Sequence, residues 1–138
     1  MNTSTRFALL VCGSRNWTEE EPIRNRLKAY PPGTILIHGD CGHYDEKTST
    51  LFGADRIAAL IGKTELGHDP LPMPAPWNRK GRKAGPIRNR LMTEVLARLR
   101  WCGYQTAVEA FPLPSSSGTW ITVNLSRKLN FRVTITEL

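Results

Sequence analysis

The sequence lacks any apolar run that approaches the roughly 20 residues needed to span a bilayer. Its first apolar run, residues 7–12, is too short for the core of a signal peptide, so we expect a cytoplasmic protein with no membrane contact. Cysteine is also scarce. Cys12, Cys41 and Cys102 are far apart and form no CxxC pair, which indicates free thiols rather than a disulfide framework.

Acidic residues are few as well, because 12 Asp and Glu stand against 19 Lys and Arg, for a net charge of +7. This excess favours an anionic partner such as a phosphate, a nucleotide or a nucleic acid, but it equally fits a solvated basic surface. The 40 % of hydrophobic residues excludes a disordered chain, and the length of 138 residues suits one domain covering residues 1–138.

Apolar segments alternate with amphipathic segments along the chain. We expect strands at 7–12, 34–38, 105–111 and 131–135, and a short strand within the proline-rich stretch 64–77. We expect helices after a Thr18 cap, at 53–63, from Pro86 to the residue before Gly103, and at 118–129, and we expect a loop at 40–50. This alternation predicts an α/β fold, a Rossmann-like open parallel sheet with helices on both faces.

Three glycine-containing loops follow expected strands, at the sheet edge where such folds bind their ligands. Glycine lets a backbone approach a ligand, helix N-termini attract anions, and Ser and Thr donate hydrogen bonds. Each glycine also fits a plain strand end, so only the set of three favours a binding site. The candidate residues are Gly13, Ser14 and Arg15 in the first loop, Gly39 and Asp40 in the second, and Ser117, Gly118 and Thr119 in the third.

Charged and aromatic residues near these loops have two interpretations each. Arg15 suits a bidentate phosphate contact or a salt bridge with Glu19 or Glu20. Trp17 stacks on a base or packs against the helix that it precedes. Asp40 and Asp55 accept ribose hydroxyls, or Asp55 only complements its helix dipole.

Further residues add weaker signals. Arg88 and Asn89, in the first turn of the longest expected helix, face either a ligand or solvent. His38, Cys41 and His43 form a loose cluster without a further metal ligand, so we predict no metal and no cofactor. Walker A, GxSxG and HExxH motifs are all missing from the sequence.

The ordered set of motifs across residues 7–135 resembles the YspA-like branch of the SLOG superfamily, which is distantly similar to the LOG phosphoribohydrolases and to DprA. The stretches that carry the resemblance are Gly13-Ser14-Arg15 with Trp17, His38-Gly39-Asp40-Cys41, Gly53-Ala54-Asp55, Pro74-Ala75-Pro76-Trp77 before Gly81, residues 84–92 (AGPIRNRLM) and Ser117-Gly118-Thr119. The resemblance implies a Rossmann-like sheet with a site for a nucleotide or an ADP-ribose-like molecule.

Two departures from the family pattern affect the expected function. The LOG enzymes use an Arg on the long helix, which Arg88 matches, and a Glu after the Gly-Thr pair, where this chain has residues 120–123 (WITV). A LOG-type hydrolase therefore needs another carboxylate, with Asp40, Asp55 and Glu94 as candidates. The segment 42–52 is an insertion, which is either a lid that places His43 or Tyr44 over the ligand or a surface loop.

Three functions fit these observations. The leading hypothesis is a sensor or sequestering protein that holds phosphates with Arg15 and Arg88, ribose with Asp40 or Asp55, and a base on Trp17 or Trp77. The second is a hydrolase that cleaves an N-glycosidic or phosphate bond of a nucleotide, with Arg88, Asp40 and Asp55 as catalytic candidates. The third is a nucleic-acid-binding module that uses the basic residues of 79–90. The apolar faces of the last two helices also suggest a homo-oligomer.

Overall fold

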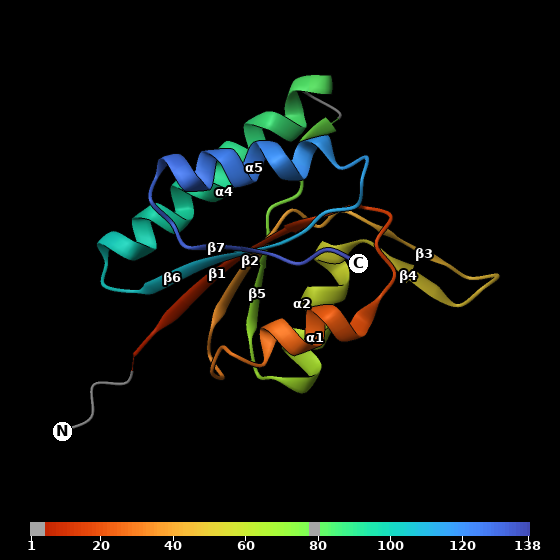
Figure 1. Cartoon of the computed structure of the whole chain (residues 1–138), viewed down its shortest axis with the longest axis horizontal. Helices are drawn as coiled ribbons and strands as arrows, with labels where there is room; N and C mark the ends of the chain where they lie inside the picture. Colours follow the sequence, from red (N-terminus) through yellow and green to blue (C-terminus); the bar gives the residue numbers. More distant parts are fainter. Residues whose placement is uncertain (1–4, 78–80) are drawn as a thin grey trace.

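The computed structural model describes residues 5–77 and 81–138 and contains a five-stranded parallel sheet with helices on both faces (Figure 1). The sheet has the order β5-β2-β1-β6-β7, formed by Asp69–Pro72, Ile35–His38, Phe7–Gly13, Gln105–Phe111 and Val133–Ile135. All four pairings are parallel, with Leu9 beside Leu36 in β2 and Ala107 in β6. The predicted Rossmann-like α/β class is therefore confirmed.

The central strand β1 explains the continuous apolar run near the start of the chain. Leu9 and Val11 pack against the core under α1 (Glu20–Leu27) and α2 (Ala54–Glu65). Ala8, Leu10 and Cys12 pack on the other face under α4 (Ala84–Trp101) and α5 (Ser117–Lys128). Because successive side chains of a strand point to opposite faces, a strand covered on both faces must be apolar throughout.

The edge strand β5 shows how a proline-rich segment joins the sheet. It contains Pro70 and Pro72 and pairs with β2 alone among the described residues. Proline lacks the N–H that a central strand needs on both sides, so an edge position tolerates it. The expected short strand within 64–77 is thus present.

The direction in which the chain is wound reverses at β1. From β1 the chain moves outward through α1 to β2 and through α2 to β5, with both helices on one face. It then returns through α4 to β6, on the other side of β1, and continues through α5 to β7 with helices on the opposite face (Figure 1). The carboxyl ends of β1 and β6 therefore form the switch point where open sheets of this kind bind ligands.

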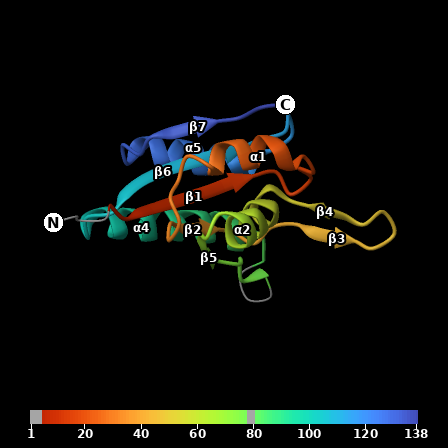
Figure 2. The same ribbon diagram turned by 90° about the horizontal axis from the view of Figure 1, so that it is seen from below.

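The segment predicted as a loop at 40–50 contains a β-hairpin instead. Strands β3 (His43–Asp45) and β4 (Thr50–Phe52) pair antiparallel and extend away from the sheet (Figure 2). Gly42 and Gly53 have positive φ angles of 137° and 111° at the base of the hairpin. Its tip is polar and exposed, and each of its strands is three residues long with no fully buried residue, so the sequence shows no apolar alternation that would have indicated strands.

Two helix starts also differ from expectation. Glu19 rather than Thr18 occupies the N-cap of α1. Helix α4 begins at Ala84, directly after a 3₁₀ turn at Gly81–Lys83, so Pro86 lies inside its first turn. A proline is accepted there because the first N–H groups of a helix have no partner within the helix.

Candidate functional site

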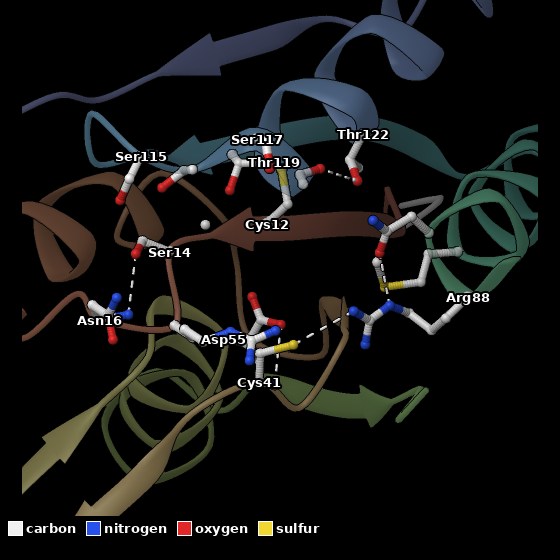
Figure 3. A pocket seen from close by; sticks show the side chains of 16 residues that line it. Cys12, Ser14, Asn16, Cys41, Asp55, Arg88, Ser115, Ser117, Thr119 and Thr122 are labelled. Atoms are coloured by element: carbon white, nitrogen blue, oxygen red, sulfur yellow. Dashed lines mark hydrogen bonds between the residues drawn. The ribbon is translucent and has the colours of Figure 1, made fainter. Parts of the chain in front are cut away.

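A cavity of about 250 Å³ lies at the switch point between β1 and β6. Its lining comes from the end of β1 and the loop after it, from Cys41 after β2, from the start of α5 and the serines before it, and from side chains of α2 and α4 (Figure 3). The lining residues are Cys12, Gly13, Ser14, Arg15, Asn16, Cys41, Asp55, Arg88, Asn89, Met92, Ser115, Ser116, Ser117, Gly118, Thr119 and Thr122.

Hydroxyl groups and a helix N-terminus form one side of the cavity. In Figure 3, Ser115, Ser117 and Thr119 lie across β1 from Asp55 and Cys41. No side chain caps α5 at Ser116, whose Oγ instead accepts a hydrogen bond from the Leu113 N–H at 2.8 Å. The Ser117 N–H donates to the Ser115 carbonyl at 3.0 Å, so the N–H groups of Gly118 and Thr119 and the positive end of the helix dipole are what α5 offers to an anion.

A buried carboxylate forms the opposite side. Asp55 is 4 % exposed, and its Oδ2 accepts hydrogen bonds from the N–H groups of Gly39 at 3.0 Å and Cys41 at 3.3 Å. Its other oxygen, Oδ1, is buried and has no hydrogen-bond partner among the described residues. A buried acceptor without a partner is costly, so a donor that reached this oxygen would stabilise it.

Burial raises the pKa of Asp55 to about 6, although the Cys41 N–H, the Arg88 guanidinium and the Gly39 N–H all lower it. The raised pKa follows from desolvation, which disfavours the charged form of a carboxyl group. Such a group exchanges its proton close to neutral pH, which suits either a donor or an acceptor role toward a ligand.

The guanidinium of Arg88 is held in place by several acceptors. Its Nη1 donates to the Gly39 carbonyl at 2.5 Å and to the Met73 carbonyl at 3.3 Å, and its Nε donates to Oδ1 of Asn89 at 2.7 Å. Its Nη2 lies 3.4 Å from Sγ of Cys41. A cation that is buried and oriented in this way supplies fixed positive charge to the cavity.

Gly39 is needed where Arg88 and Asp55 approach the end of β2. A Cβ atom at this position would overlap the Arg88 guanidinium and lie 3.0 Å from Oδ2 of Asp55. Gly39 contributes its backbone to this network and is not among the residues that line the cavity.

Most of the residues predicted for the ligand site line this one cavity. They are Gly13, Ser14, Arg15, Asp55, Arg88, Asn89, Ser117, Gly118 and Thr119. The alternative for Arg15, a salt bridge with Glu20, is not formed, since Glu20 pairs with Arg24 at 3.2 Å. Arg15 is exposed at the cavity and free to meet an anion.

Two aromatic candidates lie elsewhere, which corrects the expectation of a stacked base. Trp17 is fully buried, packs edge-on against Phe111 at 5.6 Å, and donates its Nε1–H to the Glu19 carbonyl at 2.6 Å. Trp77 is 49 % exposed and contacts Gly85 outside the cavity lining. Neither ring is placed to stack on a molecule in the cavity.

The remaining candidates also fall outside the cavity. Asp40 has a φ of 55°, which turns its carboxylate toward Arg56 at 3.4 Å. On the hairpin, His43 stacks on Phe52 with ring centroids 4.7 Å apart, and Tyr44 is 56 % exposed. The hairpin therefore does not cover the cavity as a lid through these two side chains.

Sequence reasoning missed several lining residues. Thr122 lies one helical turn after Thr119, so the 3.6-residue period could have identified it. Asn16 belongs to the loop expected after the first strand, and Ser115 and Ser116 belong to the third glycine-containing loop, so loop position could have added them to the candidates. The sequence gives no sign of Cys12 as a lining residue beyond its place at the end of a strand. Burial, together with the charge of Asp55, raises the pKa of its thiol.

His38, Cys41 and His43 do not come together as a close group in the structure. Within residues 5–77 and 81–138, no three His, Cys, Asp or Glu side chains gather closely enough to hold a metal ion. His38 is buried and its Nδ1 accepts the Asp40 N–H at 3.1 Å, and burial lowers its pKa.

Comparison with known proteins gives no evidence on the family or the function of this chain. No helix in the described part of the chain has the length and apolar character that crossing a membrane requires. Searches against family models, curated proteins and solved structures find no match to this chain.

Proposed function

We propose that this protein binds a nucleotide or a nucleotide-derived molecule at the switch-point cavity and acts as a sensor or a sequestering protein. One observation carries the proposal: the uncapped, hydroxyl-rich start of α5 lies across the cavity from a buried carboxylate with an unpartnered oxygen. An anionic group suits the first side and a hydrogen-bond donor such as a ribose hydroxyl suits the second.

Charge supports an anionic ligand. Arg15 and Arg88 both line the cavity, and among the described residues Asp55 is the only carboxylate in its lining. Together with the helix dipole, the two guanidinium groups make the cavity electropositive.

Size further limits the ligand. Ligand cavities commonly measure about 300 to 1,000 Å³, whereas this one measures about 250 Å³. No aromatic ring of the described residues lines it, so binding depends on the polar sugar and phosphate groups rather than on base stacking. A mononucleotide or cyclic nucleotide therefore fits better than an extended dinucleotide, with part of the ligand left in solvent.

A ligand panel tests the proposal. The purified protein is incubated with nucleoside monophosphates, cyclic nucleotides and ADP-ribose, and its melting temperature is measured. A true ligand at about 100 times its Kd stabilises the fold by about 2.7 kcal/mol. The stabilisation should be reduced in S117A/T119A, which removes two cavity hydroxyls. A panel that leaves the melting temperature unchanged would overturn the proposal.

A hydrolase is the second candidate because Asp55 is buried, has a pKa near neutrality and lies beside Arg88 in the cavity. Such a carboxyl group suits general acid–base catalysis of N-glycosidic or phosphate-bond cleavage. Chromatography of each compound after incubation separates the two functions. A sensor returns its ligand intact, whereas a hydrolase releases free base or phosphate and loses this turnover in D55N.

Self-association is supported by exposed apolar residues on the outer surface of α4 and α5. Leu91 is 44 % exposed and Ile121 is 46 % exposed. We infer that copies of the chain associate through this surface. Light scattering coupled to size-exclusion chromatography should then give a mass above 15.5 kDa that falls in L91S/I121S.

A further inference from the structure

Positive charge is concentrated in the second half of the chain. Residues 81–138 contain nine Lys and Arg against three Asp and Glu, whereas residues 5–77 contain eight against nine. One of the three acids, Glu109, is buried and bonded to Arg26 of α1. Every ion pair found within the described ranges is made by Arg24, Arg26 or Arg56, so the cations of α4 and α5 are not neutralised there.

The carboxyl-terminal ends of α4 and α5 meet at the end of the molecule away from the cavity (Figure 1). Nη1 of Arg100 donates to the Leu129 carbonyl at 2.9 Å, and its guanidinium lies 4.1 Å from the Phe131 ring centroid. We call the surface formed here the basic end. It consists of Arg98, Arg100, Trp101, Arg127 and Lys128, all of them exposed.

Trp101 is the unusual member of the basic end. Its side chain is 86 % exposed, so the indole contributes little to the core. Cations in the last turn of a helix complement the helix dipole, which explains Arg98, Arg127 and Lys128. The dipole gives no reason for a solvent-exposed indole between two arginines.

A flat exposed ring among free cations is the combination that single-stranded nucleic acid requires. Cations follow the phosphates, and bases stack on the aromatic ring, with little dependence on sequence. Arg98 and Trp101 are three residues apart and therefore adjacent on one side of α4. A membrane surface is less well suited, since Leu129 at 37 % exposure is the one other large apolar side chain exposed beside Trp101 among the described residues.

We propose that the basic end binds single-stranded nucleic acid, with phosphates on Arg98, Arg127 and Lys128 and a base stacked on Trp101. The surface is separate from the ligand cavity, because Arg88 and Trp101 lie 13 residues apart on α4, or about 20 Å along a helix. The proposal therefore does not depend on what the cavity binds.

Fluorescence anisotropy tests the proposal directly. A labelled oligo(dT) of about 20 nucleotides and a duplex of the same length are titrated with the full-length protein at low salt. If about four phosphates are neutralised, affinity for the single strand should fall about 50-fold between 50 and 200 mM salt. Binding should also quench the fluorescence of Trp101. The W101A substitution should weaken the affinity for the single strand between about 5- and 150-fold.

A matched pair of charge reversals supplies the control. R127E/K128E and K28E/K63E change the net charge equally, but Lys28 and Lys63 belong to the α1 and α2 side of the molecule. We expect loss of binding only in R127E/K128E, with the melting temperatures of all variants close to that of the wild type. Equal losses in both double variants, undiminished binding in W101A, or a preference for duplex would overturn the proposal. Binding to phosphatidylserine vesicles without binding to oligo(dT) would also overturn it.

Discussion

At the scale of single residues, the site depends on one carboxyl group whose environment is costly for the free protein. Only one of the two oxygens of Asp55 is hydrogen-bonded among the described residues, and burial raises the pKa of this carboxyl group from 3.8 to about 6. The unfolded chain releases this proton near pH 4, and the folded protein releases it near pH 6. Between these values stability falls as pH rises, and the loss persists above pH 6.

Because the ionisation of Asp55 destabilises the folded protein, D55N should increase stability at neutral pH. A shift of two pKa units corresponds to about 3 kcal/mol, which is the upper limit of the gain that we expect at pH 7.5. The difference between variant and wild type should vanish below about pH 4. Urea unfolding at both pH values measures it, with D40N as a control at a partly exposed carboxylate outside the cavity. A D55N variant less stable than the wild type at pH 7.5 would contradict this account of Asp55.

Single residues also show where sequence reasoning reaches its limit. Asp40 and Asp55 were equal candidates, because both follow strand β2 in the sequence. The left-handed φ of 55° at Asp40 directs one carboxylate to Arg56, whereas the first turn of α2 buries the other. Trp17 similarly suited either a stacking or a packing role. Its contact with Phe111, 94 residues later in the sequence, shows that it packs in the core.

At the scale of elements, the cavity depends on a close contact of β1, β6 and α2. A Cβ atom at Gly13 would lie 2.5 Å from Cβ of Ala54 and 2.8 Å from the Phe111 carbonyl oxygen. G13A should therefore destabilise the fold by about 1 to 3 kcal/mol, which lowers the melting temperature by several degrees.

Gly118 is the matched control for Gly13. A Cβ atom there meets no heavy atom within 4 Å, and the residue lies in the first turn of α5. G118A should melt at the wild-type temperature, as measured by circular dichroism, and should weaken ligand binding by filling space in the cavity. If G13A is as stable as G118A, the close contact of β1, β6 and α2 does not limit the stability of the fold.

The hairpin provides a separate prediction. Because Tyr44 and His43 lie outside the cavity, Y44A and H43A should bind the ligand identified in the panel with wild-type affinity. Isothermal titration calorimetry gives the Kd of each variant, and S117A/T119A is the positive control for loss. A loss in Y44A comparable to that in S117A/T119A would mean that the hairpin folds over the bound ligand.

The elements themselves were largely predictable where burial imposes a pattern. The apolar runs of β1, β2 and β6 and the periodicity of the helices identified the sheet and its alternation. The β3–β4 hairpin was not predicted because its strands are three residues long and contain no fully buried residue, so they show no such pattern. The sequence also does not show which residues start α1 and α4. The place of the cavity followed from topology, since the first and third glycine loops meet only when the sheet is wound in this order. The second loop, with Gly39 and Asp40, lies outside the cavity lining.

At the scale of the whole molecule, the two helical layers have different charge and separate possible roles. The arginines of α1 and α2 are held in ion pairs, whereas no ion pair found within the described residues involves a side chain of α4 or α5. The amino-terminal ends of α4 and α5 build one side of the cavity and their carboxyl-terminal ends form the basic end. The same two helices therefore present positive charge at both ends of the molecule. Arg79 and Lys80, which the nucleic-acid hypothesis from sequence also included, lie outside the described residues.

The most direct test of the central claim is a backbone amide NMR titration of the protein with the compound that stabilises it most. We predict that the largest chemical-shift changes fall at residues 13–16, 39–41 and 115–119, around the switch point between β1 and β6. These residues should respond much less in S117A/T119A at the same ligand concentration. Changes confined to α1 and α2, or to residues 98–101 and 127–128, would contradict the claim that the cavity is the ligand site.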